Sequence, residues 1–370
     1  MSLRVGIIGA GPSGMAQLRA FESARKNGAQ IPEIMCFEKQ ADWGGQWNSS
    51  WHTGLDGHGE PVHSGMYRHL WSNGPKECLE FSDYSFAEHF GRAISSFPPR
   101  EVLFDYIKGR VEKSDVRKYV QFNTVARHTS YNPATEEFTL TVEDLTTGTT
   151  ADHVFDKLVV FNGHFSTPAV PEFGGVNTFP GEVLHAHDFR GAERFSGKNM
   201  LMIGSSYSAE DIGMQAHQMG AASLTFSYRR APMGFDWPEN TVERPLVTRF
   251  EGTTAHFSDG TQGDPDHNAE ADFQSDSLGE LIAATDYPPF DLDAVSALFK
   301  DWMHHKETNI LGYRDMAHRS VITGTMATHH HTRWINAMDD SLQRCLNAPS
   351  QDVDTGTLAA LTGLDQVHSK

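Results

Sequence analysis

The spacing of apolar residues along the chain predicts two strand–helix–strand units. Residues 3–8 form a short apolar run rich in β-branched side chains, as expected for a buried parallel strand. A glycine-rich turn and a helical pattern follow at residues 9–26, and a second strand is expected at residues 33–37. Residues 198–203 repeat the opening pattern and again meet a glycine-led turn. The chain is therefore predicted to be an α/β protein with two dinucleotide-binding, Rossmann-like domains.

Alternating apolar and polar positions between these units predict a small antiparallel meander. Its three strands are expected at residues 120–128, 137–143 and 153–157, with a turn at Asn132-Pro133. The apolar run at residues 157–161 predicts a further buried strand.

Interruptions of these patterns indicate the domain boundaries. Residues 41–100 are rich in Gly, Trp and His and lack periodicity, which predicts a long irregular segment before a helix at residues 100–113. Pro168 and Pro171 mark a domain crossing. We therefore place the first part of one domain at residues 1–168, an inserted second domain at 169–262, and a helical C-terminal part of the first domain at 263–370. The helices of this last part are expected at residues 277–285, 292–307 and 334–346.

Composition excludes several classes of function. The 30 basic and 48 acidic residues give a net charge of -18, which disfavours nucleic acids and anionic membrane surfaces. The three cysteines include no CxxC pair, so a flavoprotein disulfide reductase is excluded and a reducing compartment is favoured. No leader-like or membrane-spanning stretch is evident. A soluble, cytoplasmic protein is expected.

The first glycine turn has the GxGxxG spacing of a dinucleotide site. Gly9 permits a tight turn, Gly11 lets a pyrophosphate approach the backbone, and Gly14 allows close packing of helix and strand. Glu38 ends the second strand, where a carboxylate can accept hydrogen bonds from an adenosine ribose. The alternative is a glycine-rich turn with a structural role only. We expect this unit to bind FAD, with further contacts from Pro12, Ser13 and Lys39.

The second glycine turn is predicted to bind NADPH. It comprises Gly204, Ser205, Ser206, Tyr207 and Ser208, so small residues still permit close approach of a nucleotide. Arg229 and Arg230 stand about twenty residues further on, where NAD-binding units carry an acid. Two guanidinium groups suit a ribose 2′-phosphate, although a solvated pair of arginines is the alternative.

A segment between the two turns identifies a family. Residues 179–189, FPGEVLHAHDF, match the pattern FxGxxxHxxx(Y/F) that identifies flavin-containing monooxygenases. Residues 44–47, GGQW, are similar to the flavin-proximal GGxW element of that family. Residues 70–76 and 326–334 resemble its bacterial branch close to trimethylamine monooxygenase. The resemblance covers nearly the whole chain.

The resemblance implies an activity. In that family NADPH reduces FAD, the reduced flavin captures O₂ as a flavin hydroperoxide, and a tertiary amine or a sulfide takes the distal oxygen. Members are often homodimers, and we expect one here. By the same resemblance Asn73 and Tyr207 are candidate catalytic residues, and Gln46, Trp47 and Trp71 are candidate flavin contacts. The alternatives are a turn asparagine, a packed tyrosine and core tryptophans.

A metal site is not expected. The three consecutive histidines at residues 329–331 point in different directions, which is poor geometry for a shared ion.

The chain departs from the family after residue 261. Relatives continue with a strand that returns to the FAD domain and a substantial further segment, whereas this chain passes within about ten residues to the start of the C-terminal helices. Because an open site would lose activated oxygen to water, three activities remain open. These are N-oxygenation of small amines such as trimethylamine, an uncoupled NADPH oxidase that makes hydrogen peroxide, and a non-catalytic nucleotide-binding relic. Baeyer–Villiger oxygenation of ketones is a more distant alternative.

Overall fold

The computed structural model of the chain forms two units. It describes residues 2–74, 76, 79–81, 83–92, 94, 97–263, 304, 306–310, 317–319 and 326–328. Unit 1 comprises Met1–Tyr67 and Leu103–Pro168, and unit 2 comprises Arg68–Val102 and Ala169–Lys370. The helices expected at residues 277–285 and 334–346, and the histidine run at 329–331, lie outside the described residues.

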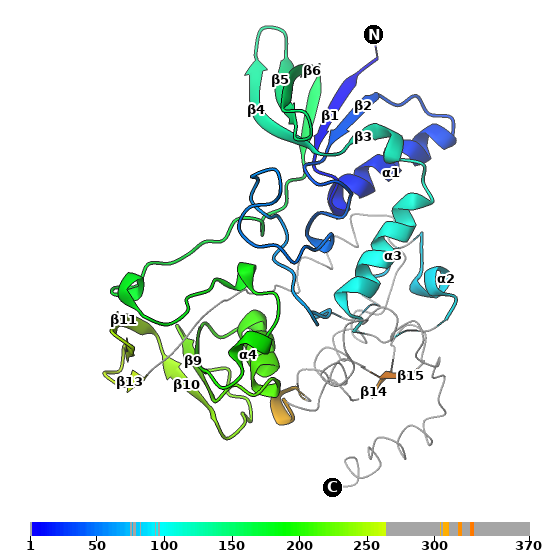
Figure 1. Cartoon of the computed structure of the whole chain (residues 1–370). Helices are drawn as coiled ribbons and strands as arrows, with labels where there is room; N and C mark the ends of the chain where they lie inside the picture. Colours follow the sequence, from blue (N-terminus) through cyan, green and yellow to red (C-terminus); the bar gives the residue numbers. More distant parts are fainter. Residues whose placement is uncertain are drawn as a thin grey trace. The chain divides into compact units, whose positions relative to one another are not determined.

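Unit 1 is built on a four-stranded parallel sheet with the strand order β3-β2-β1-β7 (Figure 1). Its strands are β1 (Arg4–Ile8), β2 (Glu33–Phe37), β3 (Val120–Gln121) and β7 (Lys157–Val160). Its helices are α1 (Pro12–Lys26), α3 (Arg100–Glu112, which begins in unit 2) and the 3₁₀ helices η1 (Gly45–Trp47) and η3 (Arg117–Tyr119). The predicted β1–α1–β2 unit is confirmed.

The two faces of this sheet are covered by different elements. Val5 and Ile7 of β1 pack with Leu18 of α1 in one buried cluster. The alternate residue Ile8 packs with Leu140 of the meander in a second cluster, because neighbouring side chains of a strand point to opposite faces. This arrangement leaves the carboxyl ends of β1 and β2 as the place where α1 begins and a ligand can approach.

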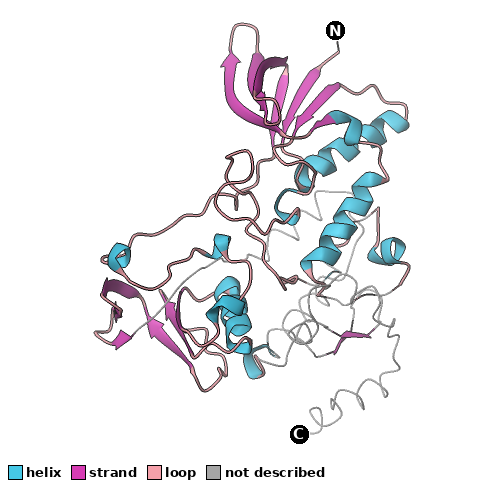
Figure 2. Cartoon of the chain, in the orientation of Figure 1, coloured by secondary structure: helices cyan, strands magenta, loops and turns pink. Residues whose placement is uncertain are grey.

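The meander forms a separate antiparallel sheet of three strands (Figure 2). Its strands are β4 (Thr124–Asn132), β5 (Glu137–Asp144) and β6 (Thr149–Phe155). The predicted turn is confirmed, since the side chain of Asn132 accepts the N–H of Ala134 at 3.0 Å.

Three details of the sequence prediction for residues 80–161 were wrong. The single strand expected at residues 120–128 is two strands, because Val120–Gln121 pairs with β2 before the chain turns into β4. The run at residues 157–161 was expected to be buried, but among the described strands β7 lies at the edge of the sheet, and Val160 is 56% exposed. The helix α2 (Phe86–Phe90), within the supposedly irregular segment, was not foreseen.

Unit 2 repeats the first half of unit 1. The parallel strands β8 (Asn199–Ile203), β9 (Ser223–Tyr228) and β10 (Thr241–Pro245) have the order β10-β9-β8, and α4 (Tyr207–Gln218) joins the first two. An antiparallel sheet follows, made of β11 (Val247–Glu251), β12 (Thr254–Phe257) and β13 (Gln262–Gly263). A two-stranded sheet comprises β14 (Ala317–Arg319) and β15 (Met326–Thr328). The three short helices before β8 are η4 (Val176–Thr178), η5 (Ala186–Asp188) and η6 (Glu193–Phe195). Two Rossmann-like units are thus confirmed.

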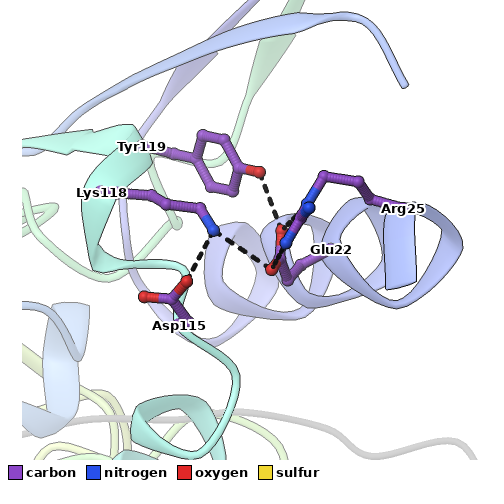
Figure 3. Close-up of polar contacts among 5 residues, drawn as sticks. All are labelled: Glu22, Arg25, Asp115, Lys118 and Tyr119. Carbon is purple, nitrogen blue, oxygen red and sulfur yellow. Dashed lines mark hydrogen bonds and ion pairs between the residues drawn. The ribbon is translucent and has the colours of Figure 1, made fainter. Parts of the chain in front are cut away.

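A buried carboxylate ties α1 to the segment before β3 (Figure 3). Glu22 is 1% exposed and accepts hydrogen bonds from Arg25, Lys118 and Tyr119. The distances lie between 2.6 and 3.1 Å. Arg25 above all holds the pKa of Glu22 far below its usual range. Because the folded pKa is depressed, this stabilisation is present at neutral pH and is lost as the pH falls below about 4.5.

Glu22→Gln is expected to lower the free energy of unfolding at pH 7 by about 2 kcal/mol, since hydrogen bonds to charged groups contribute about 1.5–3 kcal/mol. Urea unfolding measures the change, and the difference from wild type should shrink as the pH falls below the usual range of a carboxyl group. Glu112→Gln is the control, because Glu112 is 54% exposed and lies 3.9 Å from Lys108. Equal losses in both variants would contradict the special role of Glu22.

No helix in the described part of the chain is long and apolar enough to cross a membrane.

Candidate functional site

The first glycine turn connects β1 to α1 and has no room for a side chain at Gly9 or Gly14. Gly9 has a φ of +98°, and a Cβ there would lie 2.4 Å from the carbonyl oxygen of Phe161. A Cβ on Gly14 would lie 2.0 Å from the carbonyl oxygen of Gly9. Gly11 is the N-cap of α1, Pro12 is the first helical residue, and among the described residues no side chain caps the helix. The first N–H groups of α1 and its positive dipole end are therefore suited to a pyrophosphate.

Glu38 lies directly beside this turn, as predicted. Its side chain is buried, and its carboxylate oxygens accept the N–H of Ala10 at 2.6 Å and that of Gln40 at 2.9 Å. Burial raises the pKa of Glu38, and the two backbone hydrogen bonds oppose this shift. Lys39 instead donates to the carbonyl of Pro61 at 2.5 Å and is turned to the neighbouring loop.

The GGQW element packs against the same turn. The N–H of Gly44 donates to the carbonyl of Ala10 at 3.0 Å, and a Cβ on Gly11 would lie 3.5 Å from the Cα of Gly45. The structure therefore brings together two glycine-rich segments about 30 residues apart, one predicted from its GxGxxG spacing and the other from its similarity to the family.

The side chain of Gln46 contacts the backbone of a neighbouring loop. Its side-chain nitrogen donates to the carbonyl of His63 at 2.8 Å, and its side-chain oxygen accepts the N–H of Gly65 at 3.0 Å. The amide thus fixes the loop at residues 63–65. Trp47 ends η1 and is half-buried.

The second glycine turn repeats the geometry of the first within unit 2. The N–H of Gly9 donates to the carbonyl of Phe37 at 2.8 Å, and that of Gly204 donates to the carbonyl of Ser227 at the same distance. Gly204 has a φ of +143°, and Ser206 is the N-cap of α4, the helix labelled in Figure 1. Ser205 and Ser206 are half-buried and Ser208 is exposed. No side chain among the residues that are described caps α4, so its N-terminus is also suited to a phosphate.

The equivalence of the two turns shows which residue of unit 2 takes the position of Glu38. Glu38 follows Phe37 in unit 1, so the equivalent position after Ser227 is Tyr228. The two exposed arginines, Arg229 and Arg230, come next. This position in unit 2 has no carboxylate that would repel a 2′-phosphate.

Trp71 and Asn73 belong to unit 2 and differ in exposure. Trp71 is 7% exposed, and its indole N–H donates to the side chain of Asp211 in α4 at 3.3 Å. Its ring lies 6.0 Å from that of Phe97. Asn73 is exposed, in a turn where the N–H of Gly74 donates to the side chain of Ser72 at 3.1 Å. The structure thus connects Trp71 with the helix that follows the second glycine turn.

Tyr207 begins α4 and belongs to a cluster around Lys306 that the sequence did not reveal. The Lys306 ammonium lies 4.7 Å from the centroid of its ring and 2.6 Å from the carboxylate of Glu210. Burial, followed by the charge of Glu210, raises the pKa of Tyr207. The one feature of the sequence that pointed to this cluster was the acidic pair Glu210-Asp211 in the first turns of α4. In the structure both carboxylates are buried, and buried carboxylates require partners.

The first half of the family pattern has a packing role. The ring of Phe179 folds over Gly181, where a Cβ would lie 2.4 Å from a ring carbon. The ring also packs against that of Phe250 in β11, with 5.6 Å between centroids. A side chain at position 181 would therefore displace Phe179 from the core of unit 2.

The second half of the pattern makes a turn that lies beside α4. The Nδ1 of His185 accepts the N–H of His187 at 3.0 Å and so caps η5, and burial lowers the pKa of His185. Phe189 is buried and stacks on Phe195, with 6.1 Å between centroids. Together with β8 and α4 the segment lines a cavity of about 260 Å³ whose apolar lining includes Ile212.

Comparison with known proteins gives consistent results over nearly all of the chain. Residues 2–233 match the family model described as flavin-binding monooxygenase-like. The chain is 47% identical over 444 aligned residues to a trimethylamine monooxygenase of Methylocella silvestris, covering 94% of this chain and 98% of that protein. The crystal structure of Tmm from Pelagibacter sp. has a TM-score of 0.82 and 39% identity, covering 92% of this chain and 100% of that one. The S-allyl-L-cysteine S-oxygenase of Allium sativum has a TM-score of 0.62 and 26% identity, covering 72% and 62%.

The lengths in these comparisons show that a relative has residues with no counterpart in this chain. The alignment with the Methylocella protein spans 444 positions, whereas this chain has 370 residues. At least 74 aligned positions of that relative, the difference between the two numbers, therefore have no counterpart here. The predicted place of the gap, after residue 261, stays a prediction.

The two repeated glycine turns, the segment at residues 179–189 that lies beside the second of them, and the match over residues 2–233 lead to one assignment. The chain belongs to the flavin-binding monooxygenase-like family.

Proposed function

We propose that this protein is an FAD- and NADPH-dependent monooxygenase that transfers one oxygen atom of O₂ to the nitrogen of small tertiary amines such as trimethylamine. The observation that carries the proposal is the 47% identity, over 94% of the chain, to a protein named trimethylamine monooxygenase. Oxygenation of sulfides is a further possibility of the same chemistry, since both substrates offer a lone pair, and an S-oxygenase shares the fold. We further propose a cytoplasmic homodimer.

The residues of unit 1 support FAD as the cofactor of the first glycine turn. Gly9, Gly11 and Gly14 leave a side-chain-free surface at the start of α1, so the N–H groups there can hold the pyrophosphate. Glu38 lies at the end of β2, where its buried carboxylate can exchange a backbone partner for ribose hydroxyls. When bound, the reduced flavin supplies the electrons and the place at which O₂ is activated.

The residues of unit 2 support NADPH at the second turn. The N-terminus of α4 can hold the pyrophosphate, and Arg229 and Arg230 can bind the 2′-phosphate. Tyr207 begins the same helix and would lie against the nicotinamide half of the nucleotide, while Asn73 and Trp71 would contribute to the oxygenation site. The task of these side chains is to bind, orient and exclude water.

The missing segment favours a second candidate function. A site that lacks at least 74 positions of a relative has fewer residues with which to exclude water. The alternative is therefore an NADPH oxidase that releases hydrogen peroxide without oxygenating an amine, or a relic that binds nucleotides without turnover.

The measurement that separates these functions is the stoichiometry of NADPH oxidation. We expect a yellow protein whose NADPH consumption rises when trimethylamine is added, with one N-oxide formed for each NADPH oxidised and little peroxide. Amine-independent oxidation that yields only peroxide would establish the oxidase, and a protein that neither binds flavin nor oxidises NADPH would establish the relic. Dimethyl sulfide in place of the amine tests S-oxygenation, and sedimentation of the 41.1 kDa chain tests the dimer.

A further inference from the structure

A buried ion pair lies at the start of α4, outside the residues that nucleotide binding explains. The carboxylate of Glu210 is 2.6 Å from the Nζ of Lys306, and both side chains are only 3% exposed. Lys306 belongs to a short helical stretch, residues 306–308, whose neighbour Ile310 is also buried. A segment 96 residues further along the chain than Glu210 thus contacts the helix of the second glycine turn.

The surroundings of the ion pair offset the cost of burying it. Taking each ion out of water costs several kcal/mol, so an isolated pair would be unfavourable here. The Lys306 ammonium lies 4.7 Å from the ring centroid of Tyr207 and 5.1 Å from that of Phe235, within the range of cation–π attraction. Glu210 lies in the first turn of α4, where the helix dipole favours a negative charge. Four side chains from three segments therefore hold one another in place.

This arrangement restrains Tyr207 in particular. Tyr207 is the first residue of α4 and directly follows Ser206 of the second turn. One side of its ring is in contact with the ammonium, so the ring cannot rotate into that space without separating the cation from it. Movement of Lys306 would break its buried ion pair with Glu210, and breaking a buried pair costs about 3–5 kcal/mol.

We propose that Lys306 and Glu210 are positioning residues that hold the ring of Tyr207 in the orientation in which it contacts the nicotinamide nucleotide bound at the second turn. The inference deepens the proposed function and depends on it, because it takes that turn to be the NADPH site. It also means that nucleotide binding at the second turn depends on the segment that carries Lys306, which is distant in sequence from both glycine turns.

Calorimetric titration with NADP⁺ tests the proposal without turnover. Lys306→Met and Glu210→Gln are each expected to raise the Kd for NADP⁺ about tenfold, or about 1.4 kcal/mol, while the FAD content stays at the wild-type level. The double variant Lys306→Met with Glu210→Gln should bind NADP⁺ about as weakly as Lys306→Met alone, because Glu210 acts on the ring of Tyr207 through Lys306. Lys26→Met removes an exposed lysine at the end of α1 and should leave the Kd unchanged.

A second cycle determines whether Lys306 acts through Tyr207. Tyr207→Ala should weaken NADP⁺ binding, and adding Lys306→Met to it should weaken binding no further, because the ring to be positioned is already absent. Fully additive losses of NADP⁺ affinity from Tyr207→Ala and Lys306→Met would overturn the proposal. So would a Lys306→Met protein that melts at a lower temperature than wild type yet binds NADP⁺ as tightly. If the wild-type protein binds FAD but no NADP⁺, the assignment of the second turn is itself wrong and the inference fails with it.

Discussion

Purified Gly14→Ala protein is expected to be nearly colourless, with a FAD content at least about tenfold below that of wild type. The added Cβ would lie 2.0 Å from the carbonyl oxygen of Gly9, which is backbone and cannot rotate aside. Relief of this contact requires α1 to move away from β1, because Gly14 lies in the first turn of the helix. That movement displaces the N–H groups proposed to hold the pyrophosphate.

The experiment measures flavin absorbance per chain after incubation with excess FAD. Gly57→Ala is the matched control, since Gly57 has no other atom within 4 Å of its added Cβ and lies in unit 1. Binding of NADP⁺ by the same Gly14→Ala preparation shows whether unit 2 is still folded. A variant with wild-type flavin content would contradict the assignment of the first turn to FAD.

The elements that the sequence predicted well are those whose signal is local. The strand β2 was predicted with its observed bounds, Glu33–Phe37, because apolar side chains occupy both faces of a buried parallel strand. The two glycine turns could also be found, since a φ of +98° at Gly9 and +143° at Gly204 is accessible mainly to glycine. The family pattern at residues 179–189 was recognised by similarity, and only the structure gives physical reasons for Phe179 and Gly181.

What the sequence could not reveal depends on contacts between distant residues. Val120–Gln121 was merged with β4 because nothing in the local pattern indicates that these two residues pair with Cys36 and Phe37. The hydrogen bonds from the Gln46 amide to the backbone of His63 and Gly65 were not foreseen, because no spacing rule encodes them. Lys306 stood in a helical pattern like any surface lysine, and its burial beside Glu210 is visible only in the folded chain.

The same limit applies to the choice between NADPH and NADH as the nucleotide of the second turn. The spacing of about twenty residues located Arg229 and Arg230, yet it left a solvated pair of arginines as an alternative. The equivalent hydrogen bonds of Gly9 and Gly204 align the two units residue by residue and place Tyr228 at the position of Glu38. The absence of an acid at that position is a stronger argument than the presence of arginines near it, because a carboxylate there would repel a 2′-phosphate.

The double variant Arg229→Ala with Arg230→Ala is therefore expected to lower kcat/KM for NADPH at least about 10- to 100-fold, since even a single hydrogen bond from a charged group contributes about 1.5–3 kcal/mol. The kcat/KM for NADH should change little, because NADH lacks the phosphate that the guanidinium groups bind. Steady-state rates with each nucleotide give the ratio, and Arg249→Ala, which removes a 46% exposed arginine of unit 2, controls for the lost charge. Equal losses with NADPH and NADH would mean that the arginines contact a part common to both nucleotides, and the preference for NADPH would then need another origin. A variant with both arginines replaced by lysine should fall between wild type and the alanine variant, because lysine keeps the charge but loses the two-pronged geometry that a phosphate matches.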